Sequence, residues 1–299
     1  MIDILLATFN GGEFIENQLL SIIAQTYKNW RLIVHDDGSA DDTMVILKKY
    51  QSLDPRIHII EDNITCQSAA KNFLHLLSYV KSEFIIFCDQ DDIWFESKLQ
   101  VLFDGIKSET EPTAVYCNAF AYNGIHVTRH KVSLFERTTL QNSLFLNSGV
   151  QGCSLMFNRA LLNEIIDFPA YIIMHDHFVT MSAISFGKLK YIDLSLMLYR
   201  QHQKNVTGNV ALTFADRVRS FIDRNTTILD RGHYEANKSF YLKFRHKFTQ
   251  TQSKMFEAYL KFPDLNLLEK IYTILKYDFR IGSSRLVLLL KVFLKRTIN

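Results

Sequence analysis

Short apolar runs alternate with helical spacings through the first hundred residues of the chain. The runs that read as strands cover residues 2–8, 32–34, 57–60 and 84–88. The stretches with helical spacing cover residues 15–23, the segment after Asp41, and residues 69–80. Strands and helices that alternate with short connections predict a parallel α/β sheet with right-handed crossovers.

The rhythm changes after Pro112. Further strands are expected at residues 114–117, 154–157, 189–192 and 196–199, and about thirty residues after the first of them read as irregular and polar. Helices are expected through residues 161–165 and 178–184, and from about Thr213 to the end, with breaks at Pro263 and Gly282. We therefore expect a catalytic domain over residues 1–209, with halves 1–110 and 111–209, and a helical region over 210–299.

An acidic tetrad, Asp89-Gln90-Asp91-Asp92, directly follows the apolar run 84–88. A buried parallel strand would deliver these carboxylates to its carboxyl end, where open α/β sheets bind ligands. Three carboxylates in four residues repel one another, and a divalent cation that also binds substrate phosphates would offset this repulsion. The alternative is a solvated acidic turn before a helix that begins near Glu96.

Composition indicates a globular protein, with 47% hydrophobic and 13% aromatic residues in 299. Four cysteines without paired spacing argue against structural zinc and disulfides, and they fit a reducing cytoplasm. Residues 1–209 carry 17 Lys and Arg against 23 Asp and Glu, whereas residues 210–299 carry 17 against 8. This asymmetry favours a site that uses a cation, followed by a segment that meets an anionic partner, although a basic surface bundle would look the same.

Neither end of the chain reads as a membrane span or a secretory signal. An acid, Asp3, stands early, without a basic segment before the apolar run. The apolar stretch 286–294 is interrupted by Lys291 and is too short to cross a bilayer. We expect a cytoplasmic protein, either soluble or peripheral on the inner face of the membrane.

Two other strand ends carry polar residues. Residues 7–12 read Ala-Thr-Phe-Asn-Gly-Gly, which is not the Gly-x-Gly-x-x-Gly fingerprint of nicotinamide binding. Residues 36–39 read Asp-Asp-Gly-Ser, and a carboxylate there could accept the imide hydrogen of uracil or thymine, or a ribose hydroxyl. Helix capping by Ser39 or Asp41 is the alternative.

The order and spacing of these motifs over residues 1–105 resemble family-2 glycosyltransferases of the GT-A fold. The motifs that carry the resemblance are Thr8-Phe9-Asn10, Gln25-Thr26-Tyr27, Asp36-Asp37-Gly38-Ser39 with Asp41 and Thr43, and Asp89-Gln90-Asp91-Asp92-Ile93-Trp94. The resemblance implies a Rossmann-like mixed sheet flanked by helices, with a C-terminal helical extension. It also implies a nucleotide-diphosphate-sugar donor, with Asp37 at the base, Asp89 near the ribose or sugar, and Asp91 on Mn²⁺ or Mg²⁺.

The second half extends the likeness. Residues 151–159 look like the acceptor-side segment of the family, and His175-Asp176 looks like the His-Asp pair of bacterial rhamnosyltransferases. Tyr199-Arg200-Gln201-His202-x-x-Asn205-x-x-Gly208 is similar to the loop that those enzymes place over the diphosphate. The resemblance thus makes Asp176 the catalytic base, although a helix N-terminal acid is the plainer interpretation.

The remaining site residues follow from the same resemblance. Expected at the donor are Ala7, Thr8, Asn10, Asp37, Asp89, Gln90 and Arg200. Expected at the metal are Asp91 and His202, the latter through metal or phosphate. Expected at the acceptor are Gln151, Gly152, Trp94 and His175, with core packing as the alternative for Trp94 and an orienting hydrogen bond as the role of His175.

The last twenty residues are basic and amphipathic. They contain Arg280, Arg285, Lys291, Lys295 and Arg296 and no acid, with Leu286, Leu289, Leu290, Phe293 and Leu294 at helical spacing. Such a helix can lie on an anionic bilayer, or it can pack its apolar stripe on the catalytic domain.

These features together predict an inverting glycosyltransferase of bacterial cell-surface polysaccharide synthesis, in the cell wall or capsule. The resemblance favours rhamnose from dTDP-rhamnose as the transferred sugar and a saccharide or lipid-linked saccharide as the acceptor. A UDP-hexose donor and a catalytically silent carbohydrate-binding or assembly subunit remain as alternatives. No nucleic-acid partner is expected, and a nucleotidyltransferase is disfavoured because Asn10-Gly11-Gly12-Glu13 lacks a basic phosphate-binding loop.

Overall fold

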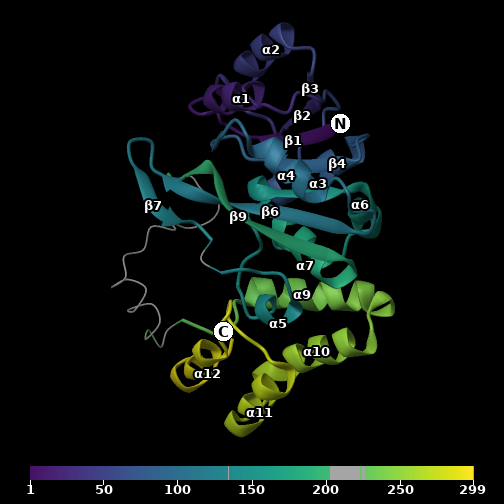
Figure 1. Ribbon diagram of the computed structural model, residues 1–299, viewed down its shortest axis with the longest axis vertical. Helices are drawn as coiled ribbons and strands as arrows, with labels where there is room; N and C mark the ends of the chain where they lie inside the picture. The colour runs from purple at the N-terminus through teal and green to yellow at the C-terminus, as the bar shows by residue number, and fades with distance from the viewer. Residues whose placement is uncertain (134, 203–222, 224–225, 299) are drawn as a thin grey trace.

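The computed structural model describes residues 1–133, 135–202, 223 and 226–298 (Figure 1). The sheet crosses the middle of the molecule, with α1 and α2 at one end and the C-terminal helices at the other. Within the described residues no helix is long and apolar enough to cross a membrane.

The first four strands form the parallel part of the sheet, in the order β3-β2-β1-β4. Their bounds are β1 (Ile2–Thr8), β2 (Trp30–Asp36), β3 (Ile57–Ile59) and β4 (Phe84–Cys88). The helices around them are α1 (Ile15–Ile23), α2 (Thr43–Leu53), α3 (Ala69–Leu76) and α4 (Lys98–Ile106). The predicted alternation of strand and helix is confirmed here.

Beyond β4 the sheet is mixed, which confirms the mixed sheet that the resemblance to the GT-A fold implied. β8 (Leu155–Asn158) runs antiparallel between β4 and β6 (Thr113–Tyr122). β6 runs parallel to β9 (Lys188–Arg200), and β5 (Ile93–Trp94) pairs antiparallel with the far end of β9. The other elements of this half are β7 (Val127–Lys131), α5 (Leu140–Ser143), α6 (Arg159–Ile165) and α7 (His175–Phe186).

Two predictions fail in this half. The strands expected at residues 189–192 and 196–199 are a single strand, β9. The register between β9 and β6 shifts in the middle of the strand, and Leu194 is half exposed there. That exposed stretch interrupts the apolar pattern without ending the strand. The segment after residue 117, expected to be irregular, contains the rest of β6 and the β6–β7 hairpin.

Each face of the sheet buries its own core, since successive side chains along a strand point to opposite faces. Leu5 and Phe87 belong to the core beneath α3, α6 and α7. Ile4 and Leu6 belong to the opposite core, beneath α1, α2 and α4. The strands therefore read as continuous apolar runs because both faces are covered.

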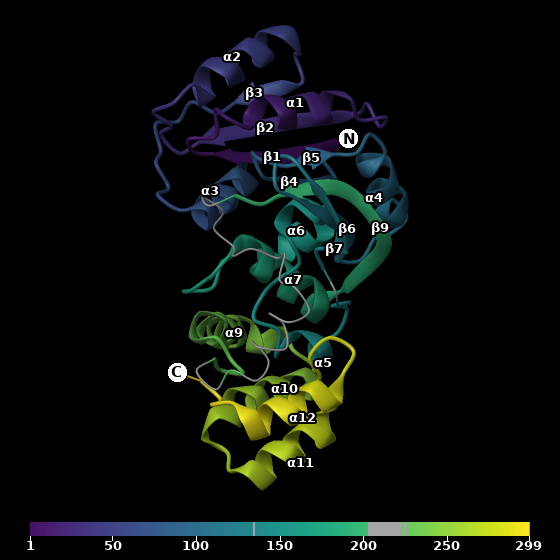
Figure 2. The same cartoon turned by 90° about the vertical axis from the view of Figure 1, so that its left-hand side faces the viewer.

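Four helices extend the first of these cores and end the described chain (Figure 2). They are α9 (Arg231–Phe244), α10 (Gln250–Lys261), α11 (Leu267–Tyr277) and α12 (Arg285–Leu294). Phe240 of α9 lies 6.2 Å from Phe178 and 5.7 Å from Phe186 of α7, measured between ring centroids. The helical prediction is confirmed over the described part, whereas the proposed domain boundary at residues 209–210 lies outside it.

Candidate active site

Three strand ends meet at one edge of the sheet. β1 runs parallel to β2 and β4, and the register aligns Thr8 with Asp36 and Leu6 with Cys88. The loops that follow these strands therefore lie side by side at the edge where open α/β sheets bind ligands. The acidic tetrad, residues 89–92, leaves β4 at this edge.

Asp36, the last residue of β2, holds this edge together. Its carboxylate accepts from Thr8 Oγ1 at 2.7 Å and from the Ser39 hydroxyl at 2.6 Å. Ser39 Oγ accepts the N–H of Asn10 at 2.8 Å, and Asn10 Oδ1 accepts the N–H of Ala40 at 2.9 Å. The side chains of Thr8 and Asn10, both predicted at the donor, therefore build the loop. The motif at residues 36–39 includes Asp36, but the sequence predicted the donor role for Asp37 and did not predict the structural role of Asp36.

Gln90 also stabilises the loop that follows β1. Its side-chain amide donates to the Phe9 carbonyl and accepts the Phe9 N–H, each at 3.0 Å. A Cβ on Gly11 would lie 2.3 Å from Gln90 Oε1, so any larger residue at position 11 would displace the Gln90 amide from the loop. Gln90 therefore binds the β1 loop to the tetrad, and half-buried Ala7 lies at the end of the same strand.

Asp37 is nearly buried, at 8% exposure, and contacts the loop that follows β3. Its Oδ1 accepts the backbone N–H of Cys66 and, at 3.1 Å, that of Gln67. The carboxylate predicted to face the nucleotide base thus also fixes a loop from a different part of the chain.

The end of β9 returns to the tetrad. His202 Nε2 lies 2.8 Å from Asp91 Oδ2, and the imidazole stacks on Phe14 with centroids 4.7 Å apart. Arg200 donates Nε–H to the Asp91 carbonyl at 2.7 Å and its backbone N–H to Asp92 Oδ1 at 3.0 Å. The structure therefore brings together Asp91, Arg200 and His202, as the resemblance implied. Asn205 and Gly208 of the same motif lie outside the described residues.

A buried lysine lies beneath the tetrad. Lys98 is fully buried and donates Nζ–H to the Cys153 carbonyl at 2.7 Å. Burial, and then the charges of Asp91 and Asp176, raise the pKa of Asp89 to about 7, while the charge of Lys98 opposes the rise. Sequence reasoning missed Lys98, because a lysine at the start of an amphipathic helix normally faces solvent.

Asp176 lies in the first turn of α7, close enough to Asp89 for their charges to interact. Burial raises the pKa of Asp176 to about 6. The backbone N–H of His177, which donates to Asp176 Oδ1 at 2.6 Å, and the charge of Arg137 both lower this pKa and so limit the rise. Arg137 donates to the carbonyls of Ser148 and Gly149, which keeps its guanidinium near the acid. A carboxylate with a pKa near the working pH is suited to general-base chemistry. Arg137 was also missed, because it stands in a segment that reads as irregular.

Comparison with known proteins agrees with this geometry. The family model of glycosyl transferase family 2 matches residues 3–166, more than half of the chain. The chain belongs to glycosyl transferase family 2. It is 30% identical over 223 residues to the dTDP-rhamnosyl transferase RfbG of Shigella flexneri, covering 68% of this chain and 73% of that protein.

Another relative of this family-2 transferase is a glucosyltransferase of Escherichia coli. It is named UDP-Glc:alpha-D-GlcNAc-diphosphoundecaprenol beta-1,3-glucosyltransferase WfgD and is 27% identical over 211 residues, or 70% of this chain and 80% of WfgD.

Solved structures show the GT-A fold. TarS 1-349 of S. aureus in complex with UDP-GlcNAc superimposes with a TM-score of 0.61 at 16% identity, over 92% of this chain and 80% of that one. The longer TarS chain is covered over 43% of its length. The mannosyltransferase PcManGT of Pyrobaculum calidifontis, solved with GDP-Man and Mn²⁺, has a TM-score of 0.56 at 14% identity, over 92% and 73% of the two chains.

The donor atoms of Asp91 and His202 in this family-2 transferase fit a divalent ion. A carboxylate suits both Mn²⁺ and Mg²⁺, whereas an imidazole nitrogen favours the transition ion. Asp89, Asp92 and Cys153 also place ligand atoms within 4.8 Å of one another. However, burial raises the pKa of the Cys153 thiol well above its usual range, so this second group is the poorer ligand set.

Two of the residues expected at the acceptor are core residues in this transferase. Trp94 is 2% exposed and lies under Lys98, whose Nζ is 3.7 Å from the ring centroid, so Trp94 packs in the core and does not form a wall of a sugar pocket. His175 is 3% exposed and lies between Phe73 and Phe87, at centroid distances of 4.0 and 4.7 Å. Burial lowers the pKa of His175 to about 3.

The orienting hydrogen bond expected of His175 is therefore wrong. Neither ring nitrogen of His175 has a hydrogen-bond partner among the described residues, and a Cβ on Gly152 would lie 2.5 Å from its Nε2. His175 acts as a neutral spacer beneath the turn that contains Gly152, and Gln151 precedes that turn. Gln151 and Gly152 thus lie beside Asp176 and remain expected at the acceptor.

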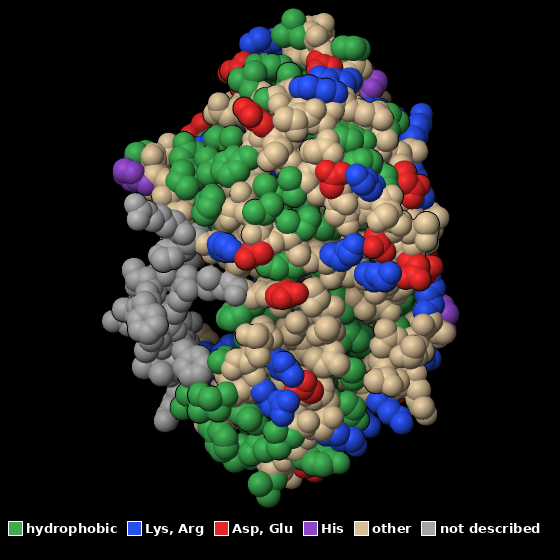
Figure 3. Space-filling model, in the orientation of Figure 1, with side chains coloured by type: hydrophobic (Ala, Val, Ile, Leu, Met, Phe, Trp, Pro, Cys, Tyr) green, Lys and Arg blue, Asp and Glu red, His purple; other side chains and the backbone are tan. Residues whose placement is uncertain are grey.

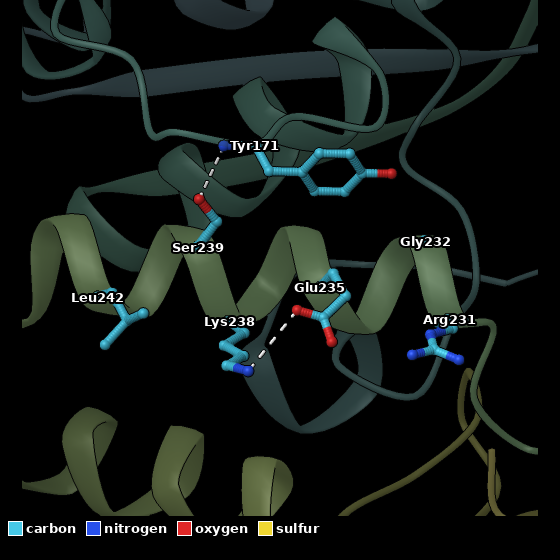
Figure 4. A pocket seen from close by; sticks show the side chains of 7 residues that line it. All are labelled: Tyr171, Arg231, Gly232, Glu235, Lys238, Ser239 and Leu242. Atoms are coloured by element: carbon cyan, nitrogen blue, oxygen red, sulfur yellow. Dashed lines mark hydrogen bonds and ion pairs between the residues drawn. The ribbon is translucent and has the colours of Figure 1, made fainter. Parts of the chain in front are cut away.

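A hollow of about 420 Å³ lies apart from the strand ends, against α9 (Figure 4). It is lined by Tyr171, Arg231, Gly232, Glu235, Lys238, Ser239 and Leu242. Tyr171 donates its backbone N–H to Ser239 Oγ of α9 at 2.9 Å. None of the residues predicted at the donor, metal or acceptor lines it.

Proposed function

We propose that this family-2 transferase moves a sugar from a nucleotide-diphosphate donor onto a saccharide acceptor with inversion, and that Asp176 is the general base. The observation that carries the proposal is the half-buried carboxylate of Asp176, with a pKa of about 6, within electrostatic range of the tetrad. Asp176 would accept the proton of the acceptor hydroxyl as that oxygen attacks the anomeric carbon. The bond from this carbon to the diphosphate breaks at the same time, on the opposite face of the sugar.

Asp91 and His202 would hold Mn²⁺ or Mg²⁺, with Mn²⁺ favoured by the imidazole ligand. The bound ion would offset the negative charge that develops on the departing diphosphate. Arg200, fixed to Asp91 and Asp92 through Nε and its backbone N–H, would add a positive charge next to that ion. Asp37, together with the backbone amides of Cys66 and Gln67 that donate hydrogen bonds to it, would face the nucleotide base.

We propose dTDP-rhamnose as the donor, in the synthesis of a bacterial cell-surface polysaccharide. The support is the likeness to the rhamnosyl transferase RfbG, at 30% identity. UDP-glucose is the second candidate, because the similar WfgD is named as a glucosyltransferase that uses UDP-Glc.

A donor panel tests both candidates. The purified protein is incubated with Mn²⁺ and, separately, dTDP-rhamnose, UDP-glucose, UDP-GlcNAc and GDP-mannose, and donor hydrolysis and the melting temperature are recorded. We expect dTDP-rhamnose to be hydrolysed fastest and to raise the melting temperature most. Preference for UDP-glucose would replace the rhamnose assignment, and indifference to all four donors would overturn the catalytic proposal.

The acceptor that we propose is lipid-linked, and the C-terminal helices would hold the enzyme on an anionic bilayer. WfgD is named for an acceptor on diphosphoundecaprenol. In this chain α11 and α12 each expose apolar side chains at i, i+4 and i+7, and hydrophobic side chains gather over these helices in Figure 3. The residues at these positions are Leu268, Tyr272 and Leu275 of α11, and Leu286, Leu290 and Phe293 of α12, and Leu267 of α11 is exposed as well.

Charge favours a bilayer over a protein partner for this surface, which we name the α11–α12 face. Residues 267–298 carry seven Lys and Arg against two Asp and Glu. Apolar stripes bordered by basic residues suit the headgroup region of an anionic membrane. The residues expected to pack if the helix stayed on the protein, Leu286, Leu290 and Phe293, are 64%, 42% and 61% exposed, whereas Leu288 is fully buried.

A further inference from the structure

Three metal-ligating side chains converge outside the catalytic edge. His35 lies near the end of β2, Asp62 in the loop after β3, and His75 in α3. His35 Nε2 is 3.3 Å from Asp62 Oδ1, and His75 Nε2 is 2.6 Å from Asp62 Oδ2. The three ligand atoms all lie within 4.8 Å of one another. Neither the proposed reaction nor the sequence motifs use these residues.

Asn72 decides which nitrogen of His35 carries the hydrogen. Asn72 Nδ2 donates to the His35 carbonyl at 3.3 Å, so its Oδ1 is the atom that faces His35 Nδ1 at 2.8 Å. Nδ1 must therefore be the protonated nitrogen of a neutral His35. Its Nε2 then presents a lone pair to Asp62 Oδ1. Two acceptors that face each other repel unless a cation lies between them.

Asp62 is the negative centre of the group. Its two carboxylate oxygens face different histidines, Oδ1 towards His35 Nε2 and Oδ2 towards His75 Nε2. The Tyr79 hydroxyl donates to Oδ2 at 2.7 Å, and the backbone N–H of Ile64 donates to Oδ1 at 3.1 Å. The Asp62 and His75 side chains are 19% and 20% exposed, so an ion has a route from solvent.

We propose that His35 Nε2, His75 Nε2 and the Asp62 carboxylate form a binding site for a divalent transition ion of the zinc class. Two imidazoles and one carboxylate are ligands of Zn²⁺, and a water would complete a four-coordinate shell. Mg²⁺ prefers oxygen ligands and is disfavoured by two nitrogens. The His35 Nδ1–H to Asn72 bond is the outer contact that commonly orients a metal-bound histidine.

The site would fix the loop between β3 and α3. Asn63 and Gln67 of this loop have φ angles of 59° and 55°, left-handed conformations that are uncommon outside glycine. The amides of Cys66 and Gln67 bind Asp37. An ion that ties Asp62 to β2 and α3 would hold the loop in the shape that reaches Asp37. Metal binding at this site does not depend on the identity of the donor.

Calorimetric titration with Zn²⁺ alone tests the site. Every protein in the experiment carries Asp91→Ala, so that the tetrad and His202 contribute little, and is stripped of metal beforehand. The variants are His75→Gln at the site, Asn72→Ala behind it, and His58→Gln, at an exposed position of β3, as the matched control. Thermal melting of each protein without metal verifies that it folds.

We expect one equivalent of Zn²⁺ to bind to the Asp91→Ala protein and to raise its melting temperature, with no change on adding His58→Gln. Asn72→Ala should weaken binding by about 10–100-fold, the scale of a lost outer contact, and His75→Gln should weaken it more. Equal binding by the His75→Gln and His58→Gln proteins would overturn the proposal. Absence of Zn²⁺ binding to the folded Asp91→Ala protein would also overturn it.

Discussion

The proposed reaction needs Asp176 in its charged form, whereas the burial of this side chain disfavours the charge. It lies at a helix N-terminus, where the dipole and the His177 N–H stabilise the carboxylate, yet burial keeps its pKa near 6. The acid is therefore mostly ionised at pH 7 and remains a stronger base than an exposed aspartate.

Replacing Asp176 by asparagine should lower kcat by about 10²–10⁴-fold, the usual contribution of a general base, because the amide cannot accept the proton. Donor affinity should change little. Steady-state kinetics and donor titration test this, with Asp104→Asn on the exposed face of α4 as the control. Loss of donor binding in Asp176→Asn would instead assign Asp176 to the nucleotide or metal site.

The charge of Arg137 should set the acid limb of the pH profile. Arg137 lowers the pKa of Asp176, so Arg137→Gln should raise it and move the loss of activity to higher pH. Arg137→Lys keeps the charge and should leave the limb close to that of the unchanged protein, near pH 6. The pH dependence of kcat measures both. A limb that stays in place in Arg137→Gln would show that another group, such as Asp89, governs it.

Removing Asp91 should abolish the metal-dependent reaction without unfolding the protein. Its carboxylate is half-buried and faces His202, so the proposed ion loses a ligand while the core is untouched. Turnover with Mn²⁺, before and after EDTA, and the melting temperature of Asp91→Ala are the measurements. Full turnover in excess EDTA would refute both the ion and the role of Asp91.

At the scale of elements, α12 has two different faces. Leu288 is fully buried, while Leu286, Leu290 and Phe293 are exposed. Deleting residues 280–299 would therefore disturb the core and the α11–α12 face together. Point substitutions on the exposed face separate membrane contact from stability.

The triple variant Leu286→Gln, Leu290→Gln, Phe293→Gln should bind less to anionic vesicles but keep donor hydrolysis and melting temperature. Vesicle sedimentation over a salt series measures it, because attraction of about 1 kcal/mol per basic residue is screened by salt. Val45→Gln with Leu53→Gln, both 69% exposed on α2, is the control. Vesicle binding equal to that of the control would remove the α11–α12 face from the proposal.

At the scale of the whole molecule, aromatic packing joins the C-terminal helices to the catalytic domain. Phe240 is 2% exposed and contacts α7 through Phe178 and Phe186. The aromatic rings of α7, α9 and α10 belong to one core that continues from the sheet into the C-terminal helices. We therefore expect the chain to unfold as one cooperative unit.

Phe240→Ala should cost about 3–5 kcal/mol in the free energy of unfolding, as other buried Phe→Ala changes do, and should keep a single transition. Leu242→Ala is the control, because Leu242 of α9 is 56% exposed, and it should lower the free energy of unfolding far less. Calorimetry and denaturant unfolding measure both. Two separate transitions would show that the helical region folds independently.

Local pattern was sufficient for the first four strands and for the tetrad. A strand that is covered on both faces is apolar along its whole length, and acidic residues can follow only where the strand ends near solvent. Phe84–Cys88 and Asp91 could therefore be identified without a structure. The position of Asp176 came from resemblance to a family, because an acid in a first helical turn has an ordinary explanation.

Contacts between distant segments decided the rest. The sequence predicted two strands in place of β9 because Leu194 is exposed where the pairing of β9 with β6 shifts. The pairing of two strands depends on both of them, so the sequence of β9 alone could not reveal this shift. The burial of Lys98 beneath Cys153 and the approach of His202 to Asp91 join segments 55 and 111 residues apart. The sequence by itself determined which residues could do chemistry, through their type and their place at strand ends. Only the tertiary structure decided which of them meet, because burial and charge depend on neighbours that the chain brings together when it folds.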